Sequence, residues 1–352
     1  MTEEPVIVAW GSRTPLGLRA APSAAAVRAH MSAVRAHPYF VDLAGDAVPA
    51  AFDRALDPTL CGGPRMLQLA LPALKECIAS AADAGRQRRV ALFLALPALR
   101  PGFSRDDTDA LVGALVRASG DFVTFSSVTT ACEGHAGGLS LMASARAALA
   151  RQTADACVVG GVESYMHPDT IEWLLGHRQL VSSESRSGFV PGEGAAFCVL
   201  CPEPTRRSVA PCARLAATAV GSESRLIKTN DVCLGDGLSD VLLRALSQTR
   251  SSARLVDSII CDVNGERYRG EEWGFACLRV AEYLTDPTAY LGPADCWGDM
   301  GAASGPLFVV LACESAARAY APGPSVLLWA GSESGLRAAV TLELRLQPER
   351  QA

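Results

Sequence analysis

The sequence predicts an α/β protein whose strands are covered by helices on both faces. Short apolar runs rich in Val, Ile and Leu alternate along the chain with longer runs rich in Ala, Leu and Arg. Continuous apolar runs are typical of strands buried on both faces, and their alternation with helices is typical of α/β folds. The 352 residues are 49% hydrophobic, enough for a large core in one or two domains.

The N-terminal part of the chain supplies the first group of predicted elements. Its strands are short apolar runs, and its helices are Ala- and Leu-rich runs that exceed the usual length of a strand. The Ala-rich stretch 18–58 has no clear period, so no element is predicted there. Strands are predicted over residues 6–10, 90–95, 156–160 and 196–201, and helices over residues 66–85, 108–117 and 134–151.

A polar, proline-rich segment at 202–211 separates two predicted strands. Such a segment is the best candidate for a boundary, which divides the chain into halves at 1–205 and 206–352. The C-terminal half repeats the alternation of apolar and Ala-rich runs. Strands are predicted over residues 213–222, 258–262, 326–330 and 339–346, and helices over residues 238–247, 271–284 and 301–321.

Composition excludes several classes of function. The net charge of −5 provides no basic surface for nucleic acid or an anionic membrane. The acidic N-terminus lacks the basic region of a signal peptide, and no uncharged apolar run is long enough to span a bilayer. Twelve scattered cysteines fit a reducing cytoplasm. Cys198 and Cys201 have the spacing of metal ligands but lie in an apolar run, so no metal is predicted.

Cys132 is the most informative residue, because it lies between a β-type run and a glycine-rich helix start. Unpaired N–H groups at a helix N-terminus stabilise a thiolate and lower the pKa of a thiol. We therefore predict that Cys132 is a nucleophile. The alternative is that it behaves as a small apolar side chain, as we expect of Cys157 and Cys313 in their apolar runs.

Four motifs follow one another along the chain: Thr14-Pro-Leu-Gly17, Thr130-Ala-Cys132, Gly160-Gly-Val-Glu163 and Gly188-Phe-Val-Pro-Gly-Glu-Gly-Ala195. In this order and at this spacing they resemble the β-ketoacyl synthases of the thiolase superfamily. The resemblance covers most of the chain. It implies a thiolase-like, five-layer αβαβα fold of two similar halves and a dimer. It also implies acyl thioesters of acyl carrier protein or coenzyme A as substrates, without a further cofactor. Glu163 and Glu193 are expected to anchor loop N–H groups.

The C-terminal half departs from that resemblance. A decarboxylating ketosynthase carries two histidines there, which stabilise the developing carbanion, but the last histidine of this chain is His177. By motif position, Asn264 replaces the first and Asp299 the second. An asparagine amide can still donate a hydrogen bond, whereas an ionised aspartate can only accept one. Asp299 would suit a general base that activates a nucleophile toward an acyl-cysteine.

Further residues are candidates for substrate contacts. The segment from Gly331 to Gly335 falls where ketosynthases have a loop that completes an oxyanion hole, with Ser332 or Glu333 near the usual gating phenylalanine. The alternative is a simple turn between strands. His135 shares a helix face with Cys132 and is expected to pack internally or face a dimer partner rather than act as a base. His167 is expected to border the acyl pocket or the dimer interface.

Two functions remain open. In the first, Cys132 captures an acyl group and passes it to a second nucleophile with help from Asn264 or Asp299, while decarboxylative condensation is impaired. In the second, the protein is a degenerate ketosynthase that pairs with a catalytic subunit, as chain length factors do. The partner of this protein is then a second copy or another ketosynthase, beside an acyl carrier protein or acyl-coenzyme A.

Overall fold

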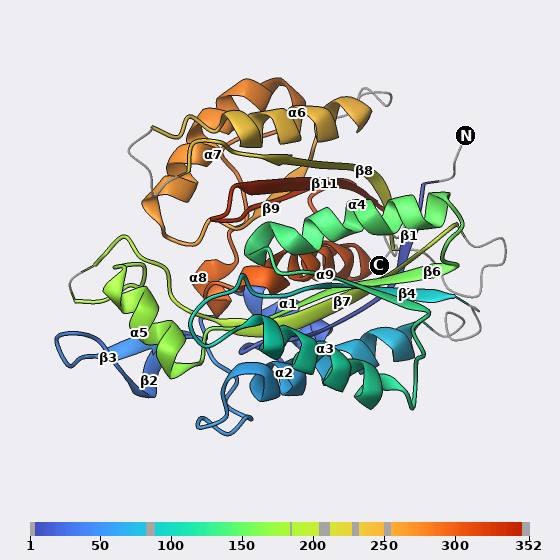
Figure 1. Ribbon diagram of the computed structural model, residues 1–352. Coiled ribbons are helices and arrows are strands. Elements are labelled where there is room, and N and C mark those ends of the chain that lie inside the picture. The colour runs from blue at the N-terminus through green and yellow to red at the C-terminus, as the bar shows by residue number, and fades with distance from the viewer. Residues whose placement is uncertain are drawn as a thin grey trace, which may run out of the picture.

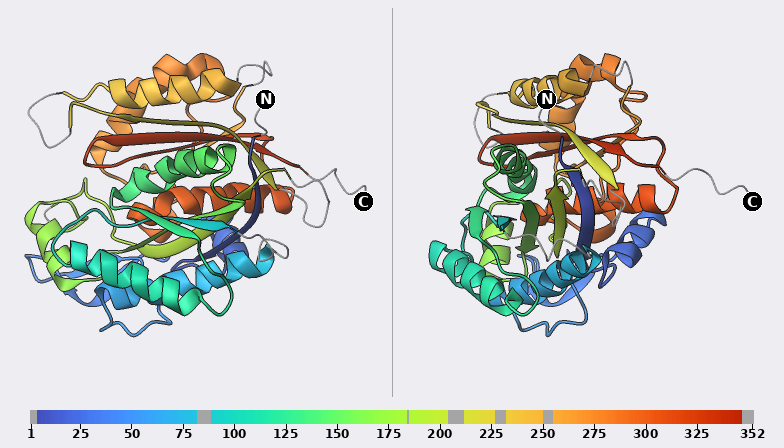
Figure 2. Two further views of the ribbon diagram at one scale, coloured as in Figure 1. Left: turned by 45° about the vertical axis from the view of Figure 1, so that its right-hand side comes forward. Right: turned by 90° about the vertical axis from the view of Figure 1, so that its right-hand side faces the viewer.

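The computed structural model describes residues 4–81, 89–183, 185–203, 212–226, 232–249 and 255–346, which form five layers (Figure 1). Helices α2 (Gly62–Ser80) and α3 (Arg105–Ser119) cover one outer face, and α6 (Asp236–Thr249) and α7 (Arg267–Val280) cover the other. Two sheet layers follow inward, with α4 and α9 between them. This arrangement confirms the predicted αβαβα fold. Figure 2 shows the same layers from two further sides.

The first half contains most of one sheet layer and the helices around it. Its elements are β1 (Val6–Arg13), α1 (Ala20–Arg28), β2 (Arg35–Val41), β3 (Ala47–Ala50), α2 (Gly62–Ser80), β4 (Val90–Ala95), α3 (Arg105–Ser119), β5 (Ser127–Ala131), the 3₁₀ turn η2 (Gly134–Ala136), α4 (Gly137–Ala150), β6 (Ala156–Ser164), α5 (Pro168–Gly176) and β7 (Glu193–Cys201).

The second half contains the other sheet layer. Its elements are β8 (Ala213–Ser222), α6 (Asp236–Thr249), β9 (Ser258–Cys261), α7 (Arg267–Val280), the 3₁₀ turn η4 (Ala281–Tyr283), α8 (Ala294–Trp297), the 3₁₀ turn η5 (Gly301–Ala303), α9 (Ser304–Ala317), β10 (Ser325–Gly331) and β11 (Leu336–Leu344).

The strands of the two layers are joined in the order β5-β4-β6-β7-β1-β8-β11-β10-β9. The junction is narrow, because β1 pairs along most of its length with β7 but meets β8 only at Val6 and Ile7. Strands β4, β6 and β7 are buried throughout, as continuous apolar runs predict. The two sheet layers therefore diverge from β1 and leave room for α4 and α9 between them.

Each predicted strand and helix has a counterpart in the structure, with shifted ends. The helix predicted to begin at residue 134 begins at Gly137, after the turn η2. The structure adds α1, the β2–β3 hairpin, β5, α5 and α8, for which no ranges were predicted. The proposed boundary between the halves falls within residues 204–211, outside the described residues, and stays a prediction.

Two buried carboxylates hold loops in place, as predicted for Glu163 and Glu193. Glu193 forms a bidentate ion pair with Arg65 at 2.6 and 2.7 Å and accepts the N–H of Asp53. Glu163 accepts the N–H of Ala302 and pairs with Arg100.

Among the described residues, no helix is both long enough and apolar enough to cross a membrane.

Candidate functional site

The segment after β5 differs from the predicted helix start. Beyond Ala131 the chain passes through Cys132 and Glu133 and turns at Gly134, whose φ of +65° suits glycine. A single 3₁₀ turn follows, and α4 begins only at Gly137. The prediction that Cys132 directly precedes an α-helix is therefore wrong, and the helix N–H groups that would stabilise its thiolate begin five residues later.

The thiol of Cys132 faces the outer layer of the molecule. Its Sγ lies 3.7 Å from Oγ1 of Thr108 in α3, and the half-buried side chain packs against the core between the sheet and helices α2 and α3. Within the described chain, no hydrogen bond joins this sulfur to Asn264 or Asp299. The structure thus separates Cys132 from the two residues predicted to act with it.

His135 occupies the place beside those two residues instead. Its Nε2 lies 2.8 Å from both carboxylate oxygens of Asp299, and the side chain is buried. Asn264 donates from Nδ2 to the same carboxylate. The structure therefore brings together Asn264 and Asp299, as their motif positions predicted, but with a histidine as the third member.

Asp299 is the hub of this cluster. Besides the bonds from His135 and Asn264, it accepts the hydroxyl of Tyr165 at 2.9 Å and the N–H of Gly301 at 2.8 Å. A carboxylate offers about four lone-pair sites. All of them are occupied here, so Asp299 has no free site from which to act as the general base that the sequence suggested.

Asn264 is also fully engaged. Its Nδ2 donates to Glu266 at 3.1 Å as well as to Asp299, and its Oδ1 accepts the N–H of Glu266. A side-chain amide has two N–H donors. Since both point into the protein, the amide does not face a thioester carbonyl in this structure.

Arg269 closes the cluster from the side of α7, and sequence reasoning did not assign it to this site. The guanidinium pairs with Asp262 at 2.7 Å and Glu266 at 3.1 Å and lies about 3.4 Å from the ring of His135. It also donates to the carbonyl of Gly331. Its closeness to Asn264 in the sequence was the one feature that could have indicated a place for Arg269 in the site. For Tyr165, the corresponding feature was its position after the Gly-Gly-Val-Glu motif.

The charges within the cluster set the protonation states. Burial opposes ionisation of Asp299, but His135, Arg269 and Asn264 outweigh it and hold the pKa of Asp299 well below its usual range. For His135, burial and the charge of Arg269 both lower the pKa. The adjacent Asp299 carboxylate outweighs them, so the pKa of His135 lies above its ordinary value. The raised pKa of His135 favours an imidazolium paired to the Asp299 carboxylate, and a protonated imidazole is not a base.

The loop predicted to complete an oxyanion hole docks against η2, and three of its N–H groups donate within the protein. Gly331 donates its N–H to Asp262 at 2.8 Å, Ser332 donates to Leu336, and Gly335 donates to the carbonyl of Ser332. The hydroxyl of Ser332 accepts the N–H of Ala136. Three of the five N–H groups of the loop are therefore bonded within the protein, and the oxyanion-hole role of the Gly331–Gly335 loop stays a prediction.

A cavity of about 160 Å³ lies beside the cluster. His135 and Glu333 line it, and Glu333 accepts a hydrogen bond from Gln179. His167 lies elsewhere: it caps α5, where its Nδ1 accepts the N–H of Asp169. The remaining wall comes from charged and aromatic side chains, chiefly Arg100, Glu133, Glu163, Tyr165, Trp173 and Phe189.

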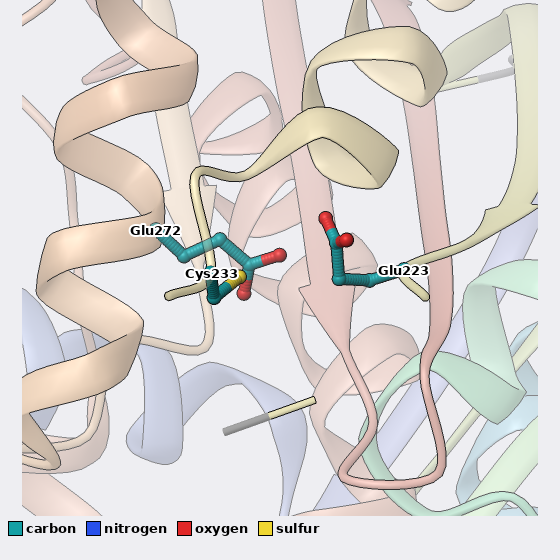
Figure 3. A group of neighbouring side chains, drawn as sticks. All are labelled: Glu223, Cys233 and Glu272. Carbon is teal, nitrogen blue, oxygen red and sulfur yellow. The ribbon is translucent and has the colours of Figure 1, made fainter. Parts of the chain in front are cut away.

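A second group of side chains has the geometry of metal ligands. One ligand atom each of Glu223, Cys233 and Glu272 lies within 4.8 Å of the others (Figure 3). Both carboxylates already have donors, however, because Glu223 accepts the N–H groups of Arg225 and Gly237, and Glu272 pairs with Arg337 at 2.7 Å. A cation here would displace these bonds and face the Arg337 guanidinium, so we assign no metal to the group.

Comparison with known proteins identifies the fold. Residues 124–205 match the family model of the β-ketoacyl synthase N-terminal domain. The chain is similar to "The ishigamide ketosynthase/chain length factor", with 19% identity, a TM-score of 0.68, and coverage of 97% of this chain and 99% of that one. A comparison with curated protein sequences found no match.

Two further solved structures give the same result. One is a type II polyketide synthase acyl-carrier protein in complex with its ketosynthase bound to the hexaketide, with 16% identity, a TM-score of 0.78, and coverage of 98% and 100% of the two chains. The other is the ketosynthase from module 6 of the bacillaene synthase of Bacillus subtilis, with 16% identity, a TM-score of 0.72, and coverage of 98% and 72%. The chain therefore has the ketosynthase fold, and its residues 124–205 are similar to the β-ketoacyl synthase N-terminal domain.

Proposed function

We propose that this protein is a non-condensing ketosynthase-fold subunit that pairs with a catalytic ketosynthase, as a chain length factor does. One observation carries the proposal: His135, and not a thiol, stands beside the side chains at the two positions where ketosynthases carry histidines. Because acyl transfer through an enzyme thioester needs a thiolate next to those groups, the site lacks its nucleophile.

The engagement of the neighbouring groups supports the same conclusion. The Asn264 amide and the Asp299 carboxylate are saturated by protein partners, and Arg269 fills the space on the α7 side. Decarboxylative condensation requires donors directed at the substrate carbonyl. We infer that malonyl thioesters do not lose carbon dioxide in this protein.

The edge of the first sheet layer supports pairing with another subunit. Strand β5 pairs with β4 on one side, and no described strand lies on its other side. Ser127, Val128 and Thr129 are exposed along it. Unpaired strand edges are templates for pairing with another chain. We place the partner ketosynthase at this edge, with an acyl carrier protein delivering thioesters to the assembly.

The experiment that tests the proposal is intact-protein mass spectrometry. The purified protein is incubated with acyl-coenzyme A and acyl-carrier thioesters of several chain lengths, beside a catalytic ketosynthase that becomes acylated under the same conditions. We expect no acyl adduct on this protein, because the thiol of Cys132 faces the α3 side.

A stable adduct would overturn the proposal if it disappears in Cys132→Ala and persists in Cys61→Ala. Cys61 is a suitable control because its thiol, like that of Cys132, is half-buried. That result would restore the alternative in which Cys132 captures an acyl group. Release of carbon dioxide from malonyl thioesters at the rate of the catalytic ketosynthase would contradict the inference on decarboxylation.

A further inference from the structure

A second cavity shares no lining residue with the cavity beside the His135 cluster. It has a volume of about 270 Å³ and lies between α1, α9 and the strands β9 and β10. Helices α1 and α9 are in contact, and Arg28, His30 and Tyr320, at or just beyond the C-terminal ends of these helices, line the cavity. The inner wall is formed by buried apolar side chains, among them Ala24, Val27, Ile260, Leu311, Ala312 and Val326.

The rim of this cavity is cationic. Arg28, in the last turn of α1, is exposed, and its guanidinium lies 4.3 Å from the centre of the Tyr320 ring. The exposed His30 stands beside it, and no acidic side chain is among the lining residues. Within the described chain, Arg28 forms no ion pair. The cavity thus combines an apolar interior with one uncompensated positive charge at the mouth.

We propose that this cavity binds a medium-chain carboxylate, with the alkyl chain inside and the carboxylate against Arg28. Apolar interiors of about 150 Å³ take up benzene. A volume of about 270 Å³ therefore suits a chain of roughly ten carbons. A cationic group at the mouth selects an anionic head over a neutral one. This proposal does not depend on the proposed function, because the two sites have no residue in common.

Isothermal calorimetry with decanoate and decanol on the full-length protein tests the proposal. We expect decanoate to bind the wild-type protein. Ala312→Phe places a phenyl ring in the cavity and should abolish this binding. Arg28→Gln should lower the affinity for decanoate about two- to fivefold, the range expected for an exposed charge pair. The affinity for decanol should not change. Arg54→Gln, a change at another exposed arginine, is the control and should bind decanoate as the wild type does.

Photo-crosslinking provides a second readout on the unaltered protein, in case Ala312→Phe fails to fold. A decanoate analogue with a diazirine near its methyl end is irradiated with the protein, and the labelled peptides are mapped. We expect labels within α9 or β9. Labels confined to the segments around His135, or decanoate affinity that is unchanged in both Ala312→Phe and Arg28→Gln, would overturn the proposal.

Discussion

At the scale of single residues, the site has become a buried network of charges. His135, Asp299 and Arg269 lie within hydrogen-bonding distance in series, and Asp262 and Glu266 balance Arg269. Each charge is buried, so its free energy depends on its partner. A group held this tightly is suited to fixing loops around η2 rather than to exchanging protons with a substrate.

The first prediction concerns the loss of one partner from this network. His135→Ala leaves the carboxylate of Asp299 buried with one donor fewer and should lower the free energy of unfolding by about 3–5 kcal/mol. Asp155→Ala, which breaks the exposed pair with Arg89, is the control and should cost less than about 1 kcal/mol. Urea denaturation followed by circular dichroism measures both, and equal losses would contradict the network.

The second prediction is a pH dependence of stability. The pKa of His135 is raised in the folded protein, so its protonation stabilises the fold fully below the ordinary histidine pKa of about 6.5. The contribution is lost as the pH rises through the raised pKa. The difference in unfolding free energy between wild type and His135→Gln should therefore be larger at pH 6 than at pH 9. A difference that is constant or grows toward pH 9 would show that the imidazole is neutral in the fold.

At the scale of elements, the connection from β5 to α4 decides what Cys132 can do. Successive residues of an extended segment point to opposite faces, and the turn at Gly134 redirects the chain before the helix begins. As a result the Cys132 side chain packs toward α3, and His135 enters the layer between the sheets. In a helix, a separation of three residues would place Cys132 and His135 on one face. In this turn the two side chains point to different layers.

The third prediction concerns the edge of β5. Val128→Lys places a charge on a side chain that is 38% exposed, so it should block association with another chain through this edge. The unfolding free energy should change by less than about 0.5 kcal/mol. Leu278→Lys on α7, where the side chain is also exposed, is the control. Analytical ultracentrifugation with the partner ketosynthase, or with a second copy, measures the effect, and undiminished assembly by Val128→Lys would place the interface elsewhere.

At the scale of the whole molecule, the two halves meet through the central helices. A Cβ added at Gly138 of α4 would lie 2.3 Å from Cδ of Pro306 in α9, and one added at Gly305 would lie 2.9 Å from atoms of Leu139. These glycines allow the helix backbones to approach closely between the two sheet layers. The middle layer is therefore the structural link between the half that carries Cys132 and the half that carries Asn264 and Asp299.

The fourth prediction tests this contact. Gly138→Ala should lower the unfolding free energy by about 1–3 kcal/mol, because the added methyl group overpacks the interface with α9. Gly270→Ala in α7, where a Cβ would meet no atom within 4 Å, should instead raise it by about 0.5–1 kcal/mol. Thermal unfolding of the two variants separates the cases, and stabilisation by both would contradict the close approach.

The amino-acid sequence alone predicts the alternation of strands and helices and the loop-anchoring carboxylates. Through the resemblance of its motifs to β-ketoacyl synthases, it also implies the five-layer architecture and places Asn264 and Asp299 at the positions of the two histidines. These follow from apolar periodicity and from motifs that are local in the chain. It also gave the correct neighbourhood of the site, since η2 and the Gly331–Gly335 loop do lie together.

Which side chains meet at the site depends on how distant segments pack together. Cys132 and His135 lie three positions apart in the chain. Because a turn replaces the first helical residues, His135 and not Cys132 lies beside Asn264 and Asp299. Whether Asp299 can act as a base depended on four donors, from His135, Asn264, Tyr165 and Gly301, which come from distant segments. Side-chain direction and hydrogen-bond saturation are properties of packing, and no local pattern in the sequence specifies them.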